Sequence, residues 1–475
     1  MEDSLTHLPH TFSQLIEKQK ALLVAAAEKA GRQLEYDAAH DEKILVAIGI
    51  VEKFLRAKRR VCYGGQAINA HLPLKHKFYD PETTIPDYDF LTPDSKSDLE
   101  DMTAMLKDEG FTDIGVRPGM HEGTTKVYVN YTPVADVTEI NPVFYSIISK
   151  RSVNKAGIYY MDPNTLRMMI YLELSRPRGE VERWEKVYER LMLLNTYAPM
   201  KGCKLGSSKQ SSKKVGRLPS ELRSMIVDFI ISEQRILCGA DVIDYYSHRL
   251  QSKANPVHWL LGGRSPLLFY SERPDDDVAA LQRRADGAFT FKKFAAVAEF
   301  FPPIYMGYMR GTTKPVVAII QTTACHSYNS VSLNDGRRIF LASFDTLVTL
   351  YLSFLFRSTL EAFFGRPILC LVERVMTLQA SFRKSPRSPF PFISIECLGH
   401  QKSYKSLLRE KIERIRKERA GAPAPASAPA GKTRRLSQRM SQSLRQRQRL
   451  KRSRGKSVST KKSQSRLSQR RPRAH

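Results

Sequence analysis

The chain has few cysteines, and they follow no recognisable pattern. None belongs to a C-x-x-C pair. This absence argues against a zinc site and against a disulfide framework, and it fits a reducing compartment. The six cysteines are Cys62, Cys203, Cys238, Cys325, Cys370 and Cys397.

Long hydrophobic runs are also missing. The longest, at residues 344–356, is too short to span a bilayer and is typical of a buried helix. The N-terminus begins Met-Glu-Asp-Ser, without the basic segment and apolar run of a secretory signal. We therefore expect a soluble intracellular protein with no membrane partner.

Negative charge is scarce, and the last 45 residues contain none. The net charge is +28, of which residues 431–475 contribute 17 through Lys and Arg, leaving +11 for the first 430 residues. A basic body usually faces a polyanion, most often nucleic acid, although charge kept for solubility gives the same composition. The tail follows a Pro/Ala spacer at 421–430 and has too few apolar residues to fold alone. It would bind phosphate without sequence preference.

Changes in periodicity along the chain predict five regions. Helical spacing dominates the beginning, short apolar runs bounded by Gly, Pro and Asp indicate strands after it, and a Lys/Ser/Gly-rich segment separates two apolar bodies. The regions are an N-terminal helical region at 1–57, a catalytic domain at 58–200, a linker at 201–217, a second body at 218–400, and a helix, spacer and basic tail at 401–475.

The first motif that indicates a chemical function is at residues 61–69. There an expected apolar strand is followed by Gly64 and Gly65 and then by an expected helix. Two glycines let backbone N–H groups approach a phosphate, and the helix N-terminus adds partial positive charge. Alone, this pattern is more often a plain tight turn.

Three aspartates support a functional interpretation of these glycines. In a strand, residues i and i+2 share a face, so Asp87 and Asp89 should project side by side and repel each other unless a cation lies between them. Asp136 stands among small apolar residues on a core strand, where a lone carboxylate is costly unless it is paired or metal-bound. Together the three form a ligand set for two divalent ions.

These motifs resemble the nucleotidyltransferase superfamily related to DNA polymerase β. More closely, residues 63–69, 86–90 and 134–136 resemble the poly(A) polymerase catalytic subunits of poxviruses, African swine fever virus and giant amoebal viruses. The resemblance implies that Asp87, Asp89 and Asp136 are catalytic metal ligands and that Gly64 and Gly65 cradle phosphate. Arg183 and Lys186, on the helix after the core, would reach the triphosphate; a solvated helix face remains an equal alternative for these two.

The same resemblance implies an α+β fold, with a polymerase β-like sheet followed by a second, degenerate nucleotidyltransferase-like domain and a disordered basic tail. It implies a template-independent poly(A) polymerase that takes ATP, an RNA 3′ end and two Mg²⁺ or Mn²⁺ ions. A homodimer or a viral processivity partner stays open. The expected location is the viral factory of the host cytoplasm or the virion, and the basic tail keeps nuclear import open.

Two alternative functions remain. A terminal uridylyl- or CCA-adding transferase would differ in nucleotide preference. A non-catalytic RNA-binding or processivity subunit would have a decayed site, and the three intact aspartates argue against it.

Residues 236–244 echo residues 61–69: an apolar strand, Gly239 with Ala240, then a helix start. The strands expected at 265–271 and 315–320 carry no aspartate, and the acidic run 275–277 is typical of a helix N-terminus. We interpret this region as a duplicated fold that has lost its metal site, with coincidence as the alternative.

Overall fold

The computed structural model describes residues 8–79, 84, 86–200, 216–250, 260–263, 265–296, 301–356, 363 and 367–421. Most of the predicted linker, the Pro/Ala spacer and the basic tail lie outside these residues. The chain divides into two compact units, residues 1–412 and 413–475. Only 413–421 of the second are described, as the end of helix α15 (Tyr404–Gly421). The five predicted domain boundaries stay predictions.

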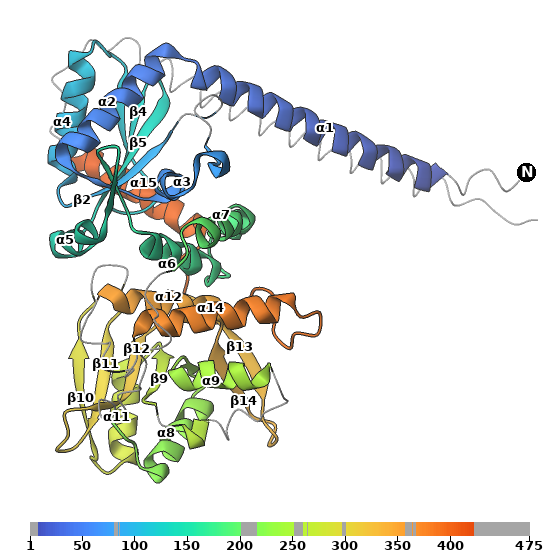
Figure 1. The fold of residues 1–475 in the computed structure, drawn as a ribbon, viewed down its shortest axis with the longest axis vertical. Coiled ribbons are helices and arrows are strands. Elements are labelled where there is room, and N and C mark those ends of the chain that lie inside the picture. Colours follow the sequence, from blue (N-terminus) through green and yellow to red (C-terminus); the bar gives the residue numbers. More distant parts are fainter. Residues whose placement is uncertain are drawn as a thin grey trace, which may run out of the picture. The chain divides into compact units, whose positions relative to one another are not determined.

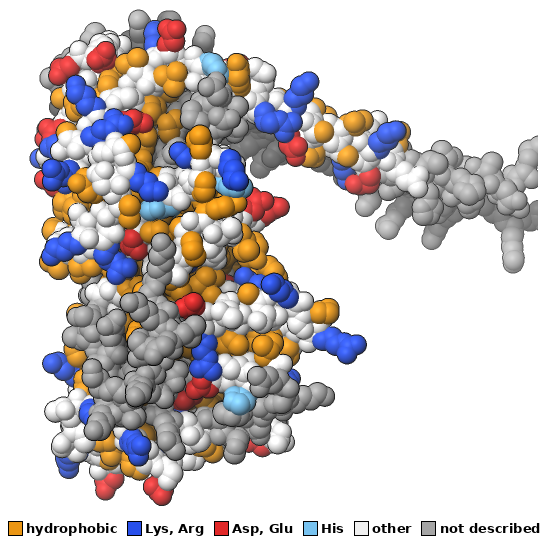
Figure 2. All heavy atoms as spheres, viewed as in Figure 1, with side chains coloured by type: hydrophobic (Ala, Val, Ile, Leu, Met, Phe, Trp, Pro, Cys, Tyr) orange, Lys and Arg blue, Asp and Glu red, His pale blue; other side chains and the backbone are white. Residues whose placement is uncertain are grey.

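The predicted N-terminal pair of helices is α1 (Leu8–Ala39) and α2 (Glu42–Lys58). Asp41 caps α2, because its carboxylate accepts hydrogen bonds from the backbone N–H groups of Lys43 and Ile44. One face of α2 is buried in the core, whereas α1 exposes Leu22 and Leu23. Figure 2 shows apolar, basic and acidic side chains interspersed along α1. None of the described helices is long and apolar enough to cross a membrane.

The first sheet has seven strands among the described residues, in the order β3-β4-β5-β2-β1-β7-β6 (Figure 1). β1 pairs antiparallel with β2 and parallel with β7, and β2 pairs parallel with β5. The strands are β1 (Val61–Cys62), β2 (Tyr88–Thr92), β3 (Ile114–Pro118), β4 (Thr124–Val129), β5 (Thr132–Glu139), β6 (Val153–Lys155) and β7 (Ile158–Tyr160). The helices around them are α3 (Gly64–His71), η1 (Leu74–His76), α4 (Ser95–Asp108), α5 (Pro142–Arg151), α6 (Pro163–Leu174), η2 (Val181–Arg183) and α7 (Trp184–Tyr197).

The second sheet has the order β10-β11-β12-β9-β8-β14-β13-β15 among the described residues. Its strands are β8 (Ile236–Leu237), β9 (Leu267–Ser271), β10 (Phe289–Phe294), β11 (Ile304–Met309), β12 (Pro315–Gln321), β13 (His326–Ser332), β14 (Arg338–Ala342) and β15 (Cys397–Leu398). The accompanying helices are α8 (Ser220–Ser232), α9 (Ala240–Arg249), α11 (Pro274–Arg284), α12 (Phe344–Ser353), η4 (Phe354–Phe356) and α14 (Ile368–Lys384). The apolar run 344–356 is thus a buried helix, as predicted.

The two sheets repeat one topology. If β1 is matched with β8, β2 with β9, and so on to β7 with β14, the order of the first sheet becomes that of the second, and every pairing keeps its direction. A bulge also recurs, after Val127 in β4 and after Gly307 in β11. These matches support the interpretation of a duplicated fold.

One buried ion pair occurs in both copies. Arg60, just before β1, contacts Asp98 of α4 through two hydrogen bonds of 2.6 and 2.8 Å. Arg235, just before β8, contacts Asp277 of α11 through two hydrogen bonds of 2.8 Å. Each pair joins the entry of the central strand to the helix that follows its antiparallel neighbour. It therefore serves the fold and not the chemistry of one site.

Helix α6, at the end of the first body, packs against α12 of the second, and α12 packs against α14 (Figure 1). At this contact the Tyr171 hydroxyl donates to Gln379 Oε1 at 3.1 Å, and the backbone N–H of Ser327 donates to the Ser175 carbonyl. The two sheets are therefore joined by helices, within a single compact unit.

The sequence prediction about disulfides is wrong. Cys325, just before β13, and Cys397 of β15 form a disulfide, with their Cα atoms 5.3 Å apart, although sequence spacing predicted no disulfide. They are 72 residues apart, so only the folded sheet brings them together. The turn between β4 and β5 lies at Asn130 and Tyr131, which have positive φ. Pro133 sits at the bulge, where the missing N–H is tolerated.

We predict that Asp98→Asn and Asp277→Asn each lower the free energy of unfolding by about 3 kcal/mol, because each leaves a buried guanidinium without its carboxylate. The matched control is Asp101→Asn, whose carboxylate is half exposed and pairs with exposed Lys58. It should cost at most about 1 kcal/mol. Urea denaturation measures all three, and equal losses for Asp98→Asn and Asp101→Asn would contradict the assignment.

Candidate active site

The register between β2 and β5 brings the three predicted aspartates together. Asp89 lies directly opposite Asp136, and Asp87 is the residue before β2. Each contributes a carboxylate oxygen to a group in which these atoms all lie within 4.8 Å of one another. Asp136 is buried, Asp89 is half-buried and Asp87 is exposed, so the cluster opens from the sheet toward solvent.

The two glycines lie directly against this cluster. The Tyr63 N–H donates to the Asp89 carbonyl at 2.9 Å, which fixes the start of the loop. Gly64 has φ +69°, and a Cβ there would stand 2.1 Å from Asp89 Oδ2, so only glycine fits. A Cβ on Gly65 would meet the Tyr79 hydroxyl at 2.4 Å. Helix α3 begins at Gly64, so its first N–H groups are beside the carboxylates.

Crowding of like charge shows in the pKa values. Burial, and then the nearby charges of Asp87 and Asp136, raise the pKa of Asp89 to about 7 from an ordinary value of 3.8. Burial and the Asp136 charge also raise the pKa of Asp87. Keeping these carboxylates ionised therefore lowers the stability of the folded protein, and a bound cation would offset this loss.

Two further observations support a cation site. Asp136 Oδ1 is buried without a hydrogen-bond partner among the described residues. Its other oxygen, Oδ2, accepts from the Lys126 ammonium at 2.5 Å, so positive charge already gathers at the cluster. Three carboxylates with a free buried oxygen suit a divalent ion with a preference for oxygen ligands. The predicted ligand set fits a metal.

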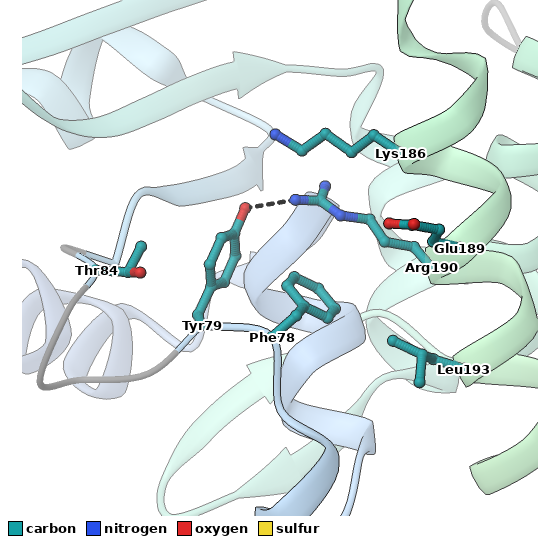
Figure 3. A pocket seen from close by; sticks show the side chains of 7 residues that line it. All are labelled: Phe78, Tyr79, Thr84, Lys186, Glu189, Arg190 and Leu193. Atoms are coloured by element: carbon teal, nitrogen blue, oxygen red, sulfur yellow. Dashed lines mark hydrogen bonds between the residues drawn. The ribbon is translucent and has the colours of Figure 1, made fainter. Parts of the chain in front are cut away.

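A pocket of about 280 Å³ lies between helix α7 and the connection that contains Phe78 and Tyr79 (Figure 3). Arg190 Nη2 donates to the Tyr79 hydroxyl at 2.8 Å, and its guanidinium lies 4.7 Å from the Phe78 ring centroid. The lining residues are Phe78, Tyr79, Thr84, Lys186, Glu189, Arg190 and Leu193. Tyr79 lines the pocket and lies against Gly65, and Gly64 lies against Asp89, so the glycine loop separates the pocket from the carboxylate cluster. Sequence analysis did not identify Phe78, Tyr79 or Arg190 as site residues, because 111 residues separate Arg190 from Tyr79.

Arg183 and Lys186 lie in different settings. Arg183 forms ion pairs with Glu173 at 3.4 Å and Glu180 at 3.0 Å, and its charge acts on Asp89. Lys186 extends from α7 above the Tyr79 ring and lines the pocket (Figure 3). Their predicted contact with a triphosphate stays a prediction.

The second sheet shows what the site looks like without its carboxylates. The β-sheet registers match Asp87, Asp89 and Asp136 with Pro266, Leu268 and Ala318. Leu268 and Ala318 are completely buried. Asp241 and Asp244, which follow Gly239, pair with Arg223 and with Arg374. The second copy therefore has no carboxylate cluster of this kind among its described residues.

Part of the first body matches a known protein family. A family model described as the poly(A) polymerase catalytic subunit matches residues 49–180, a range that contains both glycines and all three aspartates. The resemblance inferred from the sequence motifs is confirmed.

Relatives and a solved structure extend the match. A protein of Acanthamoeba polyphaga mimivirus assigned as a poly(A) polymerase catalytic subunit is 22% identical over 314 residues, which is 61% of this chain and 52% of that protein. Its counterpart in African swine fever virus (strain Badajoz 1971 Vero-adapted) is 27% identical over 164 residues, 33% of this chain and 34% of the relative. The chain thus matches about half and one third of their lengths.

The crystal structure of the Megavirus polyadenylate synthase superposes with a TM-score of 0.66 at 17% identity, covering 85% of this chain and 84% of that one. This likeness spans both sheets, and the predicted α+β fold class is confirmed.

We predict that Asp89→Asn stabilises the metal-free protein by ~1–2 kcal/mol at pH 8, a value reduced for partial exposure of the carboxylate. With a folded pKa of about 7 and an ordinary value of 3.8, Asp89 binds a proton in the folded protein but not in the unfolded chain between these values. Stability therefore falls as pH rises through this window, and the cost is fully present above pH 7. Denaturation in EDTA from pH 4 to 8 measures it. A variant less stable than the parent at pH 8 would contradict the assignment.

Proposed function

We propose that the protein is a template-independent poly(A) polymerase that transfers AMP from ATP to the 3′-hydroxyl of RNA. The 3′-oxygen attacks the α-phosphorus, the bond to pyrophosphate breaks, and the hydroxyl proton leaves to solvent or a nearby base. The observation that carries this proposal is the carboxylate cluster of β2 and β5 against the glycine loop of α3. That arrangement, in a segment of the poly(A) polymerase family, suits nucleotidyl transfer.

The nucleotide is proposed to lie along the line from the carboxylates to the aromatic pocket. Its phosphates would rest on Gly64 and Gly65, where no side chain intervenes and the first N–H groups of α3 are available. Lys186 and Arg183 would add positive charge on the α7 side. The base and ribose would enter the pocket of Phe78, Tyr79 and Arg190, where ring and guanidinium faces allow stacking.

The residues that would hold divalent metal are Asp87, Asp89 and Asp136. Two Mg²⁺ or Mn²⁺ ions, when bound, would lower the pKa of the 3′-hydroxyl and neutralise charge on the triphosphate. The protein itself contributes geometry: the β2–β5 register fixes the spacing of the carboxylates, and Gly64 leaves room beside Asp89.

The second sheet is proposed to hold RNA behind the reacting end without chemistry of its own. A polymerase without a template must still grip its product, and the first 430 residues carry a net charge of +11. Self-association or a viral processivity partner would serve the same need. Action in the viral factory or the virion remains part of the proposal.

We predict that Asp87→Asn, Asp89→Asn and Asp136→Asn each reduce nucleotide transfer by about a thousandfold or more, because each loses a metal ligand. The assay extends a labelled oligoribonucleotide with each of the four nucleoside triphosphates supplied separately, in Mg²⁺ or Mn²⁺. Asp244→Asn, the control in the second copy, should keep the parental rate because Asp244 pairs with Arg374. ATP should be the preferred substrate. Near-parental turnover by any of the three variants would contradict the metal assignment, and a preference for UTP would indicate a uridylyltransferase.

Removal of residues 422–475 should leave the rate of a single addition unchanged and weaken RNA binding. Residues 431–475 hold 17 Lys and Arg with no acidic residue, so their loss removes phosphate contacts. The logarithm of affinity should then fall less steeply with the logarithm of salt concentration. Fluorescence anisotropy between low and moderate salt tests this, and an unchanged slope would exclude a role of the tail in RNA binding.

A further inference from the structure

A row of side chains crosses the first sheet and ends at the carboxylate cluster. Arg117 of β3 lies opposite Lys126 of β4, Lys126 lies opposite Asp136 of β5, and Asp136 lies opposite Asp89 of β2. Directly opposed residues in neighbouring strands project from the same face of a sheet. Two basic side chains therefore share the face of the catalytic carboxylates and lead from it toward the outer strand.

We propose that Lys126, with Arg117 behind it, binds the last internucleotide phosphate of the RNA and so places the 3′ end beside Asp136. This inference rests on the proposed function, and it names a substrate contact that the motifs of the sequence do not contain.

The sheet order decides which side the RNA uses. The glycine loop follows β1, on one side of the β2–β5 pair, and Gly64 contacts Asp89 there. A nucleotide on that loop leaves the opposite side, toward β4 and β3, for the attacking 3′-hydroxyl. Lys126 and Arg117 are the basic groups of this row on that side. An in-line displacement needs the attacking and leaving oxygens on opposite sides of phosphorus, and this placement provides it.

The contacts of Lys126 leave it able to bind phosphate. Its ammonium donates to Asp136 Oδ2 at 2.5 Å, and about one third of the side chain is exposed. An ammonium has three donors, so one bond to Asp136 orients the group and leaves two for phosphate oxygens. Arg117 is exposed, its guanidinium lies 5.1 Å from the Tyr128 ring centroid, and it forms no ion pair with the described residues. The ring orients the guanidinium without neutralising it.

The second sheet indicates that Lys126 serves the site and not the fold. The matching registers place Met306 at the position of Lys126, opposite Ala318 at the position of Asp136. That sheet keeps the same order and bulge with a buried methionine there. The lysine is absent where the carboxylates are absent. Arg117 corresponds to Lys292, which is also basic, so the comparison of the two sheets distinguishes Lys126 but not Arg117. Lys126 is therefore the main phosphate contact proposed, and Arg117 is the secondary one.

The experiment compares the parent with Lys126→Met, Arg117→Gln and the control Lys107→Met, which removes an exposed charge at the end of α4. The substrates are labelled oligoadenylates that carry one uncharged methylphosphonate linkage, either at the last position or five linkages upstream, beside an unmodified oligomer. One readout is the Kd from fluorescence anisotropy without nucleotide or metal. The other is the KM for RNA and for ATP in a single addition.

Lys126→Met should raise the Kd and the KM for RNA roughly tenfold, the effect of losing one charge-assisted hydrogen bond, with the KM for ATP within about twofold of the parent. The parent should lose roughly tenfold in affinity with the uncharged last linkage, and Lys126→Met should lose nothing more. Arg117→Gln should show a smaller change in the same direction, and Lys107→Met none. The upstream linkage should affect parent and variant equally.

Equal sensitivity of parent and Lys126→Met to the last linkage would overturn the proposal, because Lys126 would then not contact that phosphate. An increased KM for ATP with an unchanged KM for RNA would overturn it as well, by placing Lys126 on the nucleotide side. A parent that binds these oligomers but transfers no nucleotide would instead refute the proposed function, and the anisotropy series would still test the phosphate contact.

Discussion

The constraint on which the site depends is the repulsion among three carboxylates held in one small volume. The parallel pairing of β2 with β5 puts Asp89 opposite Asp136, and the chain entering β2 adds Asp87. Burial and mutual repulsion then raise the pKa of Asp89 to about 7. The residues around the three carboxylates accommodate or reduce this repulsion. Gly64 leaves space beside Asp89, and the Lys126 ammonium donates to Asp136. Oδ1 of Asp136 has no hydrogen-bond partner among the described residues and could bind a cation. Such a site lowers stability without metal and gains binding energy with it.

The duplicated sheet separates what the fold requires from what the chemistry requires. Both copies keep the strand order, the bulge and an Arg–Asp pair before the central strand, so these features stabilise the architecture. In the first copy, β2 carries Asp89 and β5 carries Asp136. The matching positions of the second copy hold Leu268 and Ala318. Apolar residues cost nothing to bury there, whereas unpaired carboxylates would. The second copy is thus free to serve as a support, and its buried Asp241 has an arginine partner.

The carboxylate cluster and the glycine loop were predictable because their signals are local. Alternating residues in a strand point Asp87 and Asp89 the same way, and two glycines before a helix predict a phosphate-binding turn. The aromatic pocket was not predictable from spacing. Phe78 and Tyr79 lie in the connection between η1 and β2, and Arg190 reaches them from a helix more than 100 residues later. The same holds for the disulfide of Cys325 and Cys397.

By itself, the sequence determined the three aspartates, the glycine loop, the repeated pattern of the second body and the basic character of the chain, since each depends on residue type and short-range spacing. The tertiary structure alone decided strand register. Register puts Lys126 against Asp136 and matches Leu268 with Asp89. A shift of one residue in a strand would send each of these side chains to the opposite face, and that choice depends on packing across the whole sheet.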